Sequence, residues 1–220
     1  MEGDIANLPK IVELAEKYNA SIMVDDAHGL GVLGQNGSGT SNHFGLTDKV
    51  DLIMGTFSKS LASIGGFIAA DLDTINYLKH NARSLIFSAS IAPANAASVI
   101  AAVDLIQKEP ERIQRLWDNT HYAMAALKKA GFDTGHSVTP IIPILIRDDY
   151  KTFQLTKIAL ERGIFVNPVV SPAVPSTSSL IRYSLMATHT TAQIDESVAV
   201  LSQIATEIGV FDQQESTVHK

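Results

Sequence analysis

Two apolar runs in this sequence each end in polar residues with complementary chemistry. SIMVDDAH (21–28) ends in acid and an imidazole, and DLIMGTFSK (51–59) ends in hydroxyls and an amine. Both runs have the composition of buried strands. Because ligands bind at the carboxyl ends of strands in open parallel sheets, one site can gather these groups. The candidate members of that site are Asp25, Asp26, His28, Thr56, Ser58 and Lys59.

These groups match the chemical needs of pyridoxal phosphate. A lysine forms a Schiff base with its aldehyde, and a carboxylate pairs with the pyridinium nitrogen. A donor binds the phenolate oxygen, while hydroxyls and backbone N–H groups hold the phosphate. Taken singly, Asp25 and Asp26 could be capping residues, His28 a core histidine and Lys59 a surface cation. The residues alone therefore predict an amine–acid–imidazole site for a carbonyl cofactor.

The elements that position these residues alternate between strand and helix, which predicts an α/β fold. Apolar periodicity predicts helices at 4–18 (beginning near Asn7), 74–81, 93–108, 111–129, 151–162 and 191–206. Apolar runs predict strands at 21–27, 51–58, 64–70, 84–90, 139–147, 163–170 and 180–187.

A glycine pattern, GLGVLG (29–34), fits the dinucleotide-binding motif and follows a strand. That motif requires a helix to begin there, so that the pyrophosphate lies at its N-terminus. The chain continues instead with QNGSGTSNHFG, which has no helical period, and two aspartates precede the glycines. A glycine-rich loop is therefore the preferred interpretation, and a nucleotide-binding dehydrogenase is kept as an alternative function.

Composition narrows the function classes further. The 220 residues are 45% hydrophobic and carry a net charge of −6 without a basic run, so nucleic acid is not an expected partner. Without cysteine there are no disulfides, thiolate nucleophiles or zinc–sulfur sites, and no metal site is expected. No apolar run reaches the ~18 residues of a transmembrane segment. These features suit a cytoplasmic protein.

The segments MVDDAHGLGVLG and GTFSKSL resemble the α-oxoamine synthase family of fold-type I pyridoxal phosphate enzymes. EGDIANLPKIVELAEKY, ARSLIFSASIAPANAA and LIRYSLMATHT resemble the same family in the same order. The resemblance implies that Asp25 pairs with the pyridine nitrogen and that His28 contacts the phenolic oxygen. It implies that Lys59 is the Schiff-base lysine and the general acid and base. Further implied roles are phosphate binding by Thr56, Ser58 and Ser88, and binding of the amino-acid carboxylate by Arg182.

The family condenses an amino acid with an acyl-CoA thioester. TFSKSLASIGGF and GIFVNPVVSPAVP are most similar to bacterial serine palmitoyltransferases, which implies condensation of serine with palmitoyl-CoA in sphingolipid biosynthesis. Glycine C-acetyltransferase and 8-amino-7-oxononanoate synthase are the alternatives within the family. The resemblance also implies a homodimer with a shared active site. Ala89 departs from the hydroxyl that the family often has after Ser88, which puts the phosphate contact from that segment in doubt.

Family members are much longer, and the difference lies at the N-terminus. The chain is therefore expected to be the C-terminal part of such an enzyme, without its main phosphate loop and first strands. Residues 1–110 would complete the large parallel-sheet domain, 111–212 would form the small α/β domain, and 213–220 a tail. An inactive truncated fragment is the non-enzyme alternative.

Overall fold

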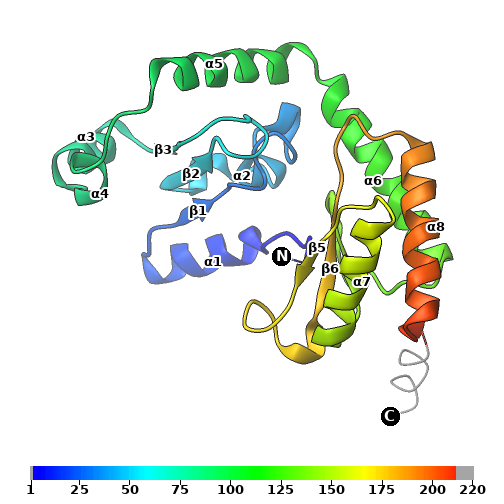
Figure 1. Ribbon diagram of the computed structural model, residues 1–220. Helices are drawn as coiled ribbons and strands as arrows, with labels where there is room; N and C mark the ends of the chain where they lie inside the picture. Colours follow the sequence, from blue (N-terminus) through cyan, green and yellow to red (C-terminus); the bar gives the residue numbers. More distant parts are fainter. Residues whose placement is uncertain (1, 212–220) are drawn as a thin grey trace. The chain divides into compact units, whose positions relative to one another are not determined.

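The chain divides into two units in the computed structural model, which describes residues 2–211 (Figure 1). The N-terminal unit is Ala6–Ile113, and the C-terminal unit contains residues 2–5 and 114–211. The division falls in the first turn of helix α6 (Glu111–Lys129). The domain limits expected from the sequence stay a prediction, and the expected tail at 213–220 lies outside the described residues.

The N-terminal unit is built on a three-stranded sheet. Its order is β1 (Met23–Asp25), β2 (Leu52–Thr56) and β3 (Gly66–Ala69), with β1 and β2 parallel and β2 and β3 antiparallel. The last pair is antiparallel because a short loop returns the chain directly beside β2, whereas parallel pairing requires a crossover. The expectation of a parallel sheet is therefore confirmed for β1 and β2 and is wrong for β3.

Helices α1 and α5 lie on opposite sides of this sheet (Figure 1). Helix α1 (Leu8–Tyr18) begins after Asn7, whose side chain accepts from the backbone of Lys10, and packs Leu8 and Val12 against Ile22. Helix α5 (Pro93–Lys108) begins with proline, which suits a first turn that needs no amide donor. The shorter elements are η1 (Gln35–Gly37), α2 (Thr40–His43), η2 (Thr47–Lys49), α3 (Leu72–Asn81) and α4 (Arg83–Ile86).

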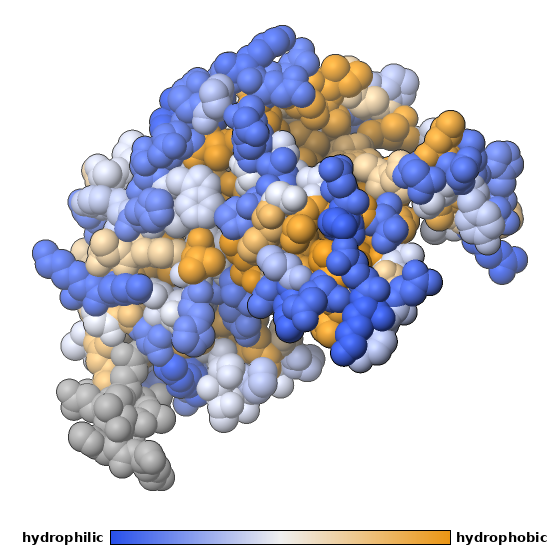
Figure 2. All heavy atoms as spheres, turned by 180° about the vertical axis from the view of Figure 1, so that it is seen from behind, coloured by the Kyte–Doolittle hydropathy of each residue, from blue (hydrophilic) through white to orange (hydrophobic). Residues whose placement is uncertain are grey.

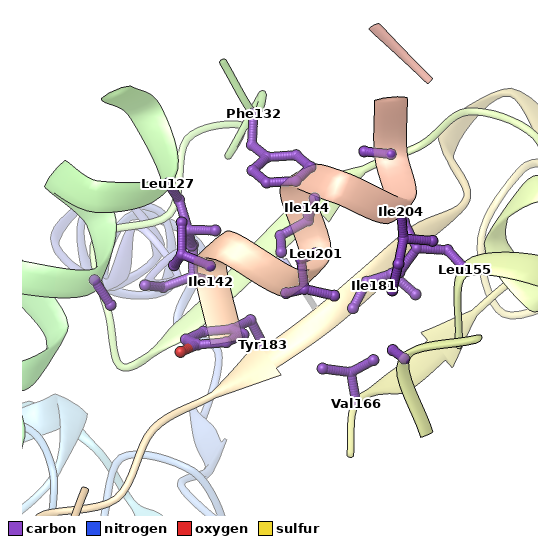
Figure 3. Packing of buried hydrophobic residues seen from close by; sticks show 14 of the residues in the cluster. Leu127, Phe132, Ile142, Ile144, Leu155, Val166, Ile181, Tyr183, Leu201 and Ile204 are labelled. Atoms are coloured by element: carbon purple, nitrogen blue, oxygen red, sulfur yellow. The ribbon is translucent and has the colours of Figure 1, made fainter. Parts of the chain in front are cut away.

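The C-terminal unit contains the larger apolar core. Its antiparallel sheet has the order β4 (Ile141–Leu145), β6 (Leu180–Ser184) and β5 (Asn167–Val169). Isoleucines and Tyr183 from this sheet pack against leucines and other apolar residues of α6, α7 (Asp149–Glu161) and α8 (Thr191–Glu207) (Figure 3). The segment between β5 and β6 contains only the short helix η3 (Ser176–Ser178).

Most elements expected from the sequence are present, with shifted ends. The strand expected at 84–90 is wrong, because Arg83–Ile86 forms helix α4 and residues 87–92 belong to no strand. A short apolar run cannot be assigned to strand or helix by periodicity alone. Within residues 2–211, no helix is both long and apolar enough to cross a bilayer.

Candidate active site

Asp25 and His28 lie where β1 ends. Asp25 is exposed and pairs in register with Met54 of β2, so the end of β1 lies beside the end of β2. One Asp25 carboxylate oxygen accepts from the backbone N–H of Ala27 at 3.0 Å, and its remaining acceptor positions can take a donor from a ligand. His28 follows in a turn and is also exposed.

Asp26 has the opposite environment to its neighbour Asp25. Its side chain is buried, and it accepts from the Thr40 backbone N–H at 2.7 Å and from the Thr40 hydroxyl at 2.5 Å. A Cβ at Gly29 or Gly39 would stand 2.0 Å from an Asp26 oxygen, so the glycines let the loop close around the carboxylate. Asp26 is therefore a structural residue that caps α2, which is the simpler of the two interpretations that its sequence position allows.

The glycine-rich segment after β1 does not form a dinucleotide site of the Rossmann type. Residues 29–34 lead into the 3₁₀ turn η1, where Asn36 has φ of 51°, and the next helix, α2, has only four residues. No helix begins at the glycines to receive a pyrophosphate. We call residues 26–34 the histidine loop.

Lys59 lies in a tight loop between β2 and β3, which we call the lysine loop (residues 57–65). The Phe57 N–H donates to Gly65 O at 2.9 Å, and the Ser63 N–H donates to Phe57 O at 2.7 Å. Within the loop, the Ala62 N–H donates to Lys59 O at 3.0 Å. These bonds hold the backbone while the Lys59 side chain is exposed.

Hydroxyls stand at the base of the lysine loop. Thr56 Oγ1 and Ser58 Oγ are 2.9 Å apart, and the Ser58 N–H donates to Thr56 Oγ1 at 3.3 Å. Thr56 also donates to Gly65 O at 3.3 Å. Two hydroxyls and a backbone N–H at the end of a strand are a donor set of the kind that binds phosphate oxygens.

The two remaining predicted site residues belong to other elements of the chain. Ser88 follows α4, is exposed, and donates to Leu85 O at 3.2 Å. Arg182 belongs to the C-terminal unit, on β6. It pairs with Pro143 and Asn167 on the neighbouring strands, and its partial burial lowers the pKa of the guanidinium.

Side-chain alternation along β6 places Arg182 on the sheet face opposite to the main core, because Ile181 and Tyr183 belong to that core. The Arg182 guanidinium remains a cation at neutral pH. An arginine held on a strand, on the face away from the helices, is suited to bidentate recognition of a carboxylate.

The N-terminal unit therefore fits pyridoxal phosphate by the chemistry of its donors. The ends of two neighbouring parallel strands supply Asp25 and His28 on one side and Thr56, Ser58 and Lys59 on the other. An amine for the aldehyde, a carboxylate for the ring nitrogen and hydroxyls for the phosphate are all present.

Comparison with known proteins agrees with this chemistry. The sequence profile of the family "Aminotransferase class I and II" matches residues 1–201. The chain is 61% identical over 204 residues to a serine palmitoyltransferase of Sphingobacterium spiritivorum, and the alignment covers 93% of this chain and 51% of that protein. A serine palmitoyltransferase of Bacteroides ovatus is 59% identical over 201 residues, covering 91% and 51%. An 8-amino-7-oxononanoate synthase of Thermosipho melanesiensis is 45% identical over 211 residues, covering 96% and 54%.

Solved structures confirm the predicted fold class. A serine palmitoyltransferase described as having a PLP internal aldimine superposes with a TM-score of 0.91 at 32% identity, covering 96% of this chain and 53% of that chain. The enzyme from S. paucimobilis with a bound PLP–myriocin aldimine gives a TM-score of 0.90, also at 32% identity and with the same coverage. The chain thus spans about half the length of the relatives that it matches.

Proposed function

Because the chain belongs to the class I and II aminotransferase family, we propose that it contributes the lysine-bearing part of a pyridoxal phosphate enzyme that condenses serine with a long-chain acyl-CoA. The observation that carries the proposal is the pair of neighbouring parallel strands, of which β1 ends in Asp25 and β2 leads into the lysine loop. Identities of 59–61% to serine palmitoyltransferases, against 45% to an 8-amino-7-oxononanoate synthase, favour serine as the amino acid. The 3-keto product would enter sphingolipid synthesis.

When bound, pyridoxal phosphate supplies an electron sink for negative charge at the Cα of the amino acid. In our proposal, the Asp25 carboxylate holds the proton on the ring nitrogen, and His28 donates to the phenolic oxygen. The Thr56 and Ser58 hydroxyls bind the phosphate, with Ser88 as a further candidate. The Lys59 amine holds the cofactor and moves the proton at the substrate Cα.

In the same proposal, Arg182 binds the carboxylate of serine through two parallel N–H donors. The other half of the length seen in relatives would supply the remaining phosphate donors, in a homodimer. Condensation releases coenzyme A and carbon dioxide, so both products can be assayed.

The test uses a fusion protein in which the N-terminal half of the Sphingobacterium spiritivorum relative precedes this chain. We expect the fusion protein to release coenzyme A from palmitoyl-CoA only when serine is present. Borohydride reduction followed by peptide mapping should place the cofactor on Lys59. Lys59→Ala should abolish both results, while Lys10→Ala, which removes an exposed lysine paired with Glu13 on α1, should change neither.

Two results would contradict the proposal. Labelling at another lysine, with full turnover in Lys59→Ala, would remove Lys59 from its role. Formation of 8-amino-7-oxononanoate, or coenzyme A release from acetyl-CoA with glycine, would assign the chain to one of the two alternative activities.

A further inference from the structure

We propose that Ser60 is a positioning residue that ties the lysine loop to the histidine loop and thereby sets how Lys59 stands relative to His28. This inference rests on the proposed function, because it concerns the placement of groups that hold the cofactor. Ser60 itself is not assigned any contact with the cofactor or the substrate.

The tie is a hydrogen bond from the Ser60 hydroxyl to the carbonyl oxygen of Leu30. Ser60 is the residue after Lys59, and Leu30 is two residues after His28, so the bond joins the two loops next to their functional side chains. The two residues are 30 positions apart in sequence, and local backbone geometry does not enforce the contact.

A close approach at Gly31 supports the same contact independently. A Cβ added at Gly31 would lie 2.6 Å from the Cβ of Ser60 and 2.8 Å from its hydroxyl oxygen. Gly31 also has φ of +76°, a conformation that residues with a side chain rarely adopt. The histidine loop therefore lies directly against Ser60, at a distance that only glycine permits.

Each loop has its own anchor besides this bond. The histidine loop is fixed through the buried Asp26 and Thr40. The lysine loop is fixed to α5 by Ser63, whose hydroxyl donates to Asn95 O at 3.2 Å and accepts from the Asn95 side chain at 3.3 Å. Loss of the Ser60 hydroxyl should therefore change the relative placement of two formed loops, without unfolding either of them.

The experiment compares Ser60→Ala with Ser63→Ala in the fusion protein. Both variants remove one hydroxyl from the lysine loop, but only the first removes the tie to the histidine loop. We expect Ser60→Ala to weaken pyridoxal phosphate affinity by about two- to tenfold, the range for one hydrogen bond. The midpoint pH of the cofactor's absorbance change should rise, because a displaced His28 leaves the phenolic oxygen more basic. Ser63→Ala frees the lysine loop from Asn95 but keeps the tie to the histidine loop, so it should leave the midpoint pH unchanged.

Hydrogen exchange provides a readout that does not require the cofactor. Amides of residues 28–34 should exchange faster in Ser60→Ala than in the unaltered protein, and not in Ser63→Ala. Gly31→Ala places a methyl group against Ser60 from the histidine loop and should reproduce the effects of Ser60→Ala. It serves as the second variant if the Ser60→Ala protein does not fold.

The possible outcomes separate this inference from the proposed function. Unchanged exchange and unchanged affinity in Ser60→Ala, or equal effects in both serine variants, would overturn the positioning role while Lys59 labelling persists. If the unaltered fusion protein shows no adduct at Lys59, the proposed function fails and the positioning role fails with it. In that case, faster exchange in Ser60→Ala would still report that the two loops touch.

Discussion

At the scale of single residues, burial separates the roles of two neighbouring carboxylates. Asp25 is exposed at the end of β1, whereas Asp26 is buried and accepts two hydrogen bonds from Thr40. β1 ends at Asp25 and the chain turns after Asp26, so the two acids reach different surroundings. One is available to a ligand, and the other holds the fold.

This contrast predicts that asparagine at position 26 mainly lowers the stability of the fusion protein, whereas asparagine at position 25 mainly weakens its cofactor binding. Asp26→Asn should lower the free energy of unfolding by about 2–3 kcal/mol, because an amide donor would face the Thr40 donors. Asp25→Asn should change stability by less than about 0.5 kcal/mol, as exposed substitutions usually do, but should weaken cofactor binding. Urea unfolding and cofactor titration of both variants provide the measurements. Equal stability losses would contradict the assignment.

A second prediction at this scale concerns Arg182. Arg182→Ala in the fusion protein should raise the KM for serine far more than the KM for palmitoyl-CoA. The loss of a hydrogen bond to a charged group costs about 1.5–3 kcal/mol. Arg182→Lys, which keeps the charge without the planar fork, should recover only part of the loss. Steady-state kinetics with each substrate varied in turn is the measurement, and equal effects on both substrates would show that Arg182 does not bind the carboxylate.

At the scale of elements, local sequence signals explain how α8 begins. Thr190 accepts from the backbone of Gln193, and the Gln193 side chain accepts from the backbone N–H of Thr190, which completes a capping box. The helix then buries Ile194, Leu201 and Ile204 against the main core. The cap satisfies backbone donors that would otherwise have no partner in the first turn.

Thr190→Ala should therefore destabilise the chain by about 1 kcal/mol. Thr206→Ala is the matched control: Thr206 lies on the same helix, is exposed, and its hydroxyl bonds only within the helix, to Ser202 O. Thermal unfolding monitored by circular dichroism should show a lower midpoint for the first variant only. A similar lowering in both would indicate that loss of a threonine side chain from this helix, and not loss of the cap, is responsible.

Strong local signals also explain which elements the sequence predicts well. The helices predicted at 93–108 and 111–129 are confirmed at both ends. Proline begins the first, and apolar residues repeat with a period of 3.6 residues over the whole length of the second. The strand expected at 84–90 is wrong, since its apolar residues belong to a short helix and to a loop. Tertiary contacts decide whether such a short apolar run forms a strand or a helix.

In the candidate site, too, the features set by local sequence are predictable and the long-range contacts are not. Strand ends are local features, so the sequence predicts that β1 and β2 end at the same edge of the sheet, and the parallel pairing of Asp25 with Met54 confirms that the two strands are neighbours. The roles of Asp25 and Lys59 stay a prediction. The bonds from Asp26 to Thr40 and from Ser60 to Leu30 join residues that are 14 and 30 positions apart. No periodicity or motif in a single sequence carries that information.

At the scale of the whole molecule, the N-terminal unit leaves much apolar surface exposed. Ile64, Ile100 and Phe87 are 76%, 67% and 80% exposed, and apolar side chains gather along α5 (Figure 2). A hollow of 510 Å³ between α5 and the lysine loop is lined mainly by apolar side chains, including Phe57, Leu61, Phe67, Val99, Val103 and Ile106. Apolar patches of this kind mark surfaces that bind another protein segment.

The sheet of the same unit has only three strands, with β1 and β3 at its edges. Edge strands present backbone groups to which further strands can pair. Open edges and an apolar hollow are surfaces against which further chain segments can pair and pack. They also predict the behaviour of the 220-residue chain when it is made alone.

The isolated chain should bind pyridoxal phosphate weakly, self-associate, and fail to condense serine with palmitoyl-CoA. Lys59 and Asp25 are present, but a phosphate dianion requires several N–H donors, and the donors identified near Lys59 are two hydroxyls and a backbone N–H. Cofactor titration with borohydride mapping, together with sedimentation velocity, should be run beside the fusion protein. The fusion protein should bind tightly and sediment as one defined species. Stoichiometric labelling at Lys59 and turnover by the isolated chain would show that its own residues suffice, and that its open sheet edges and apolar surface need no further partner.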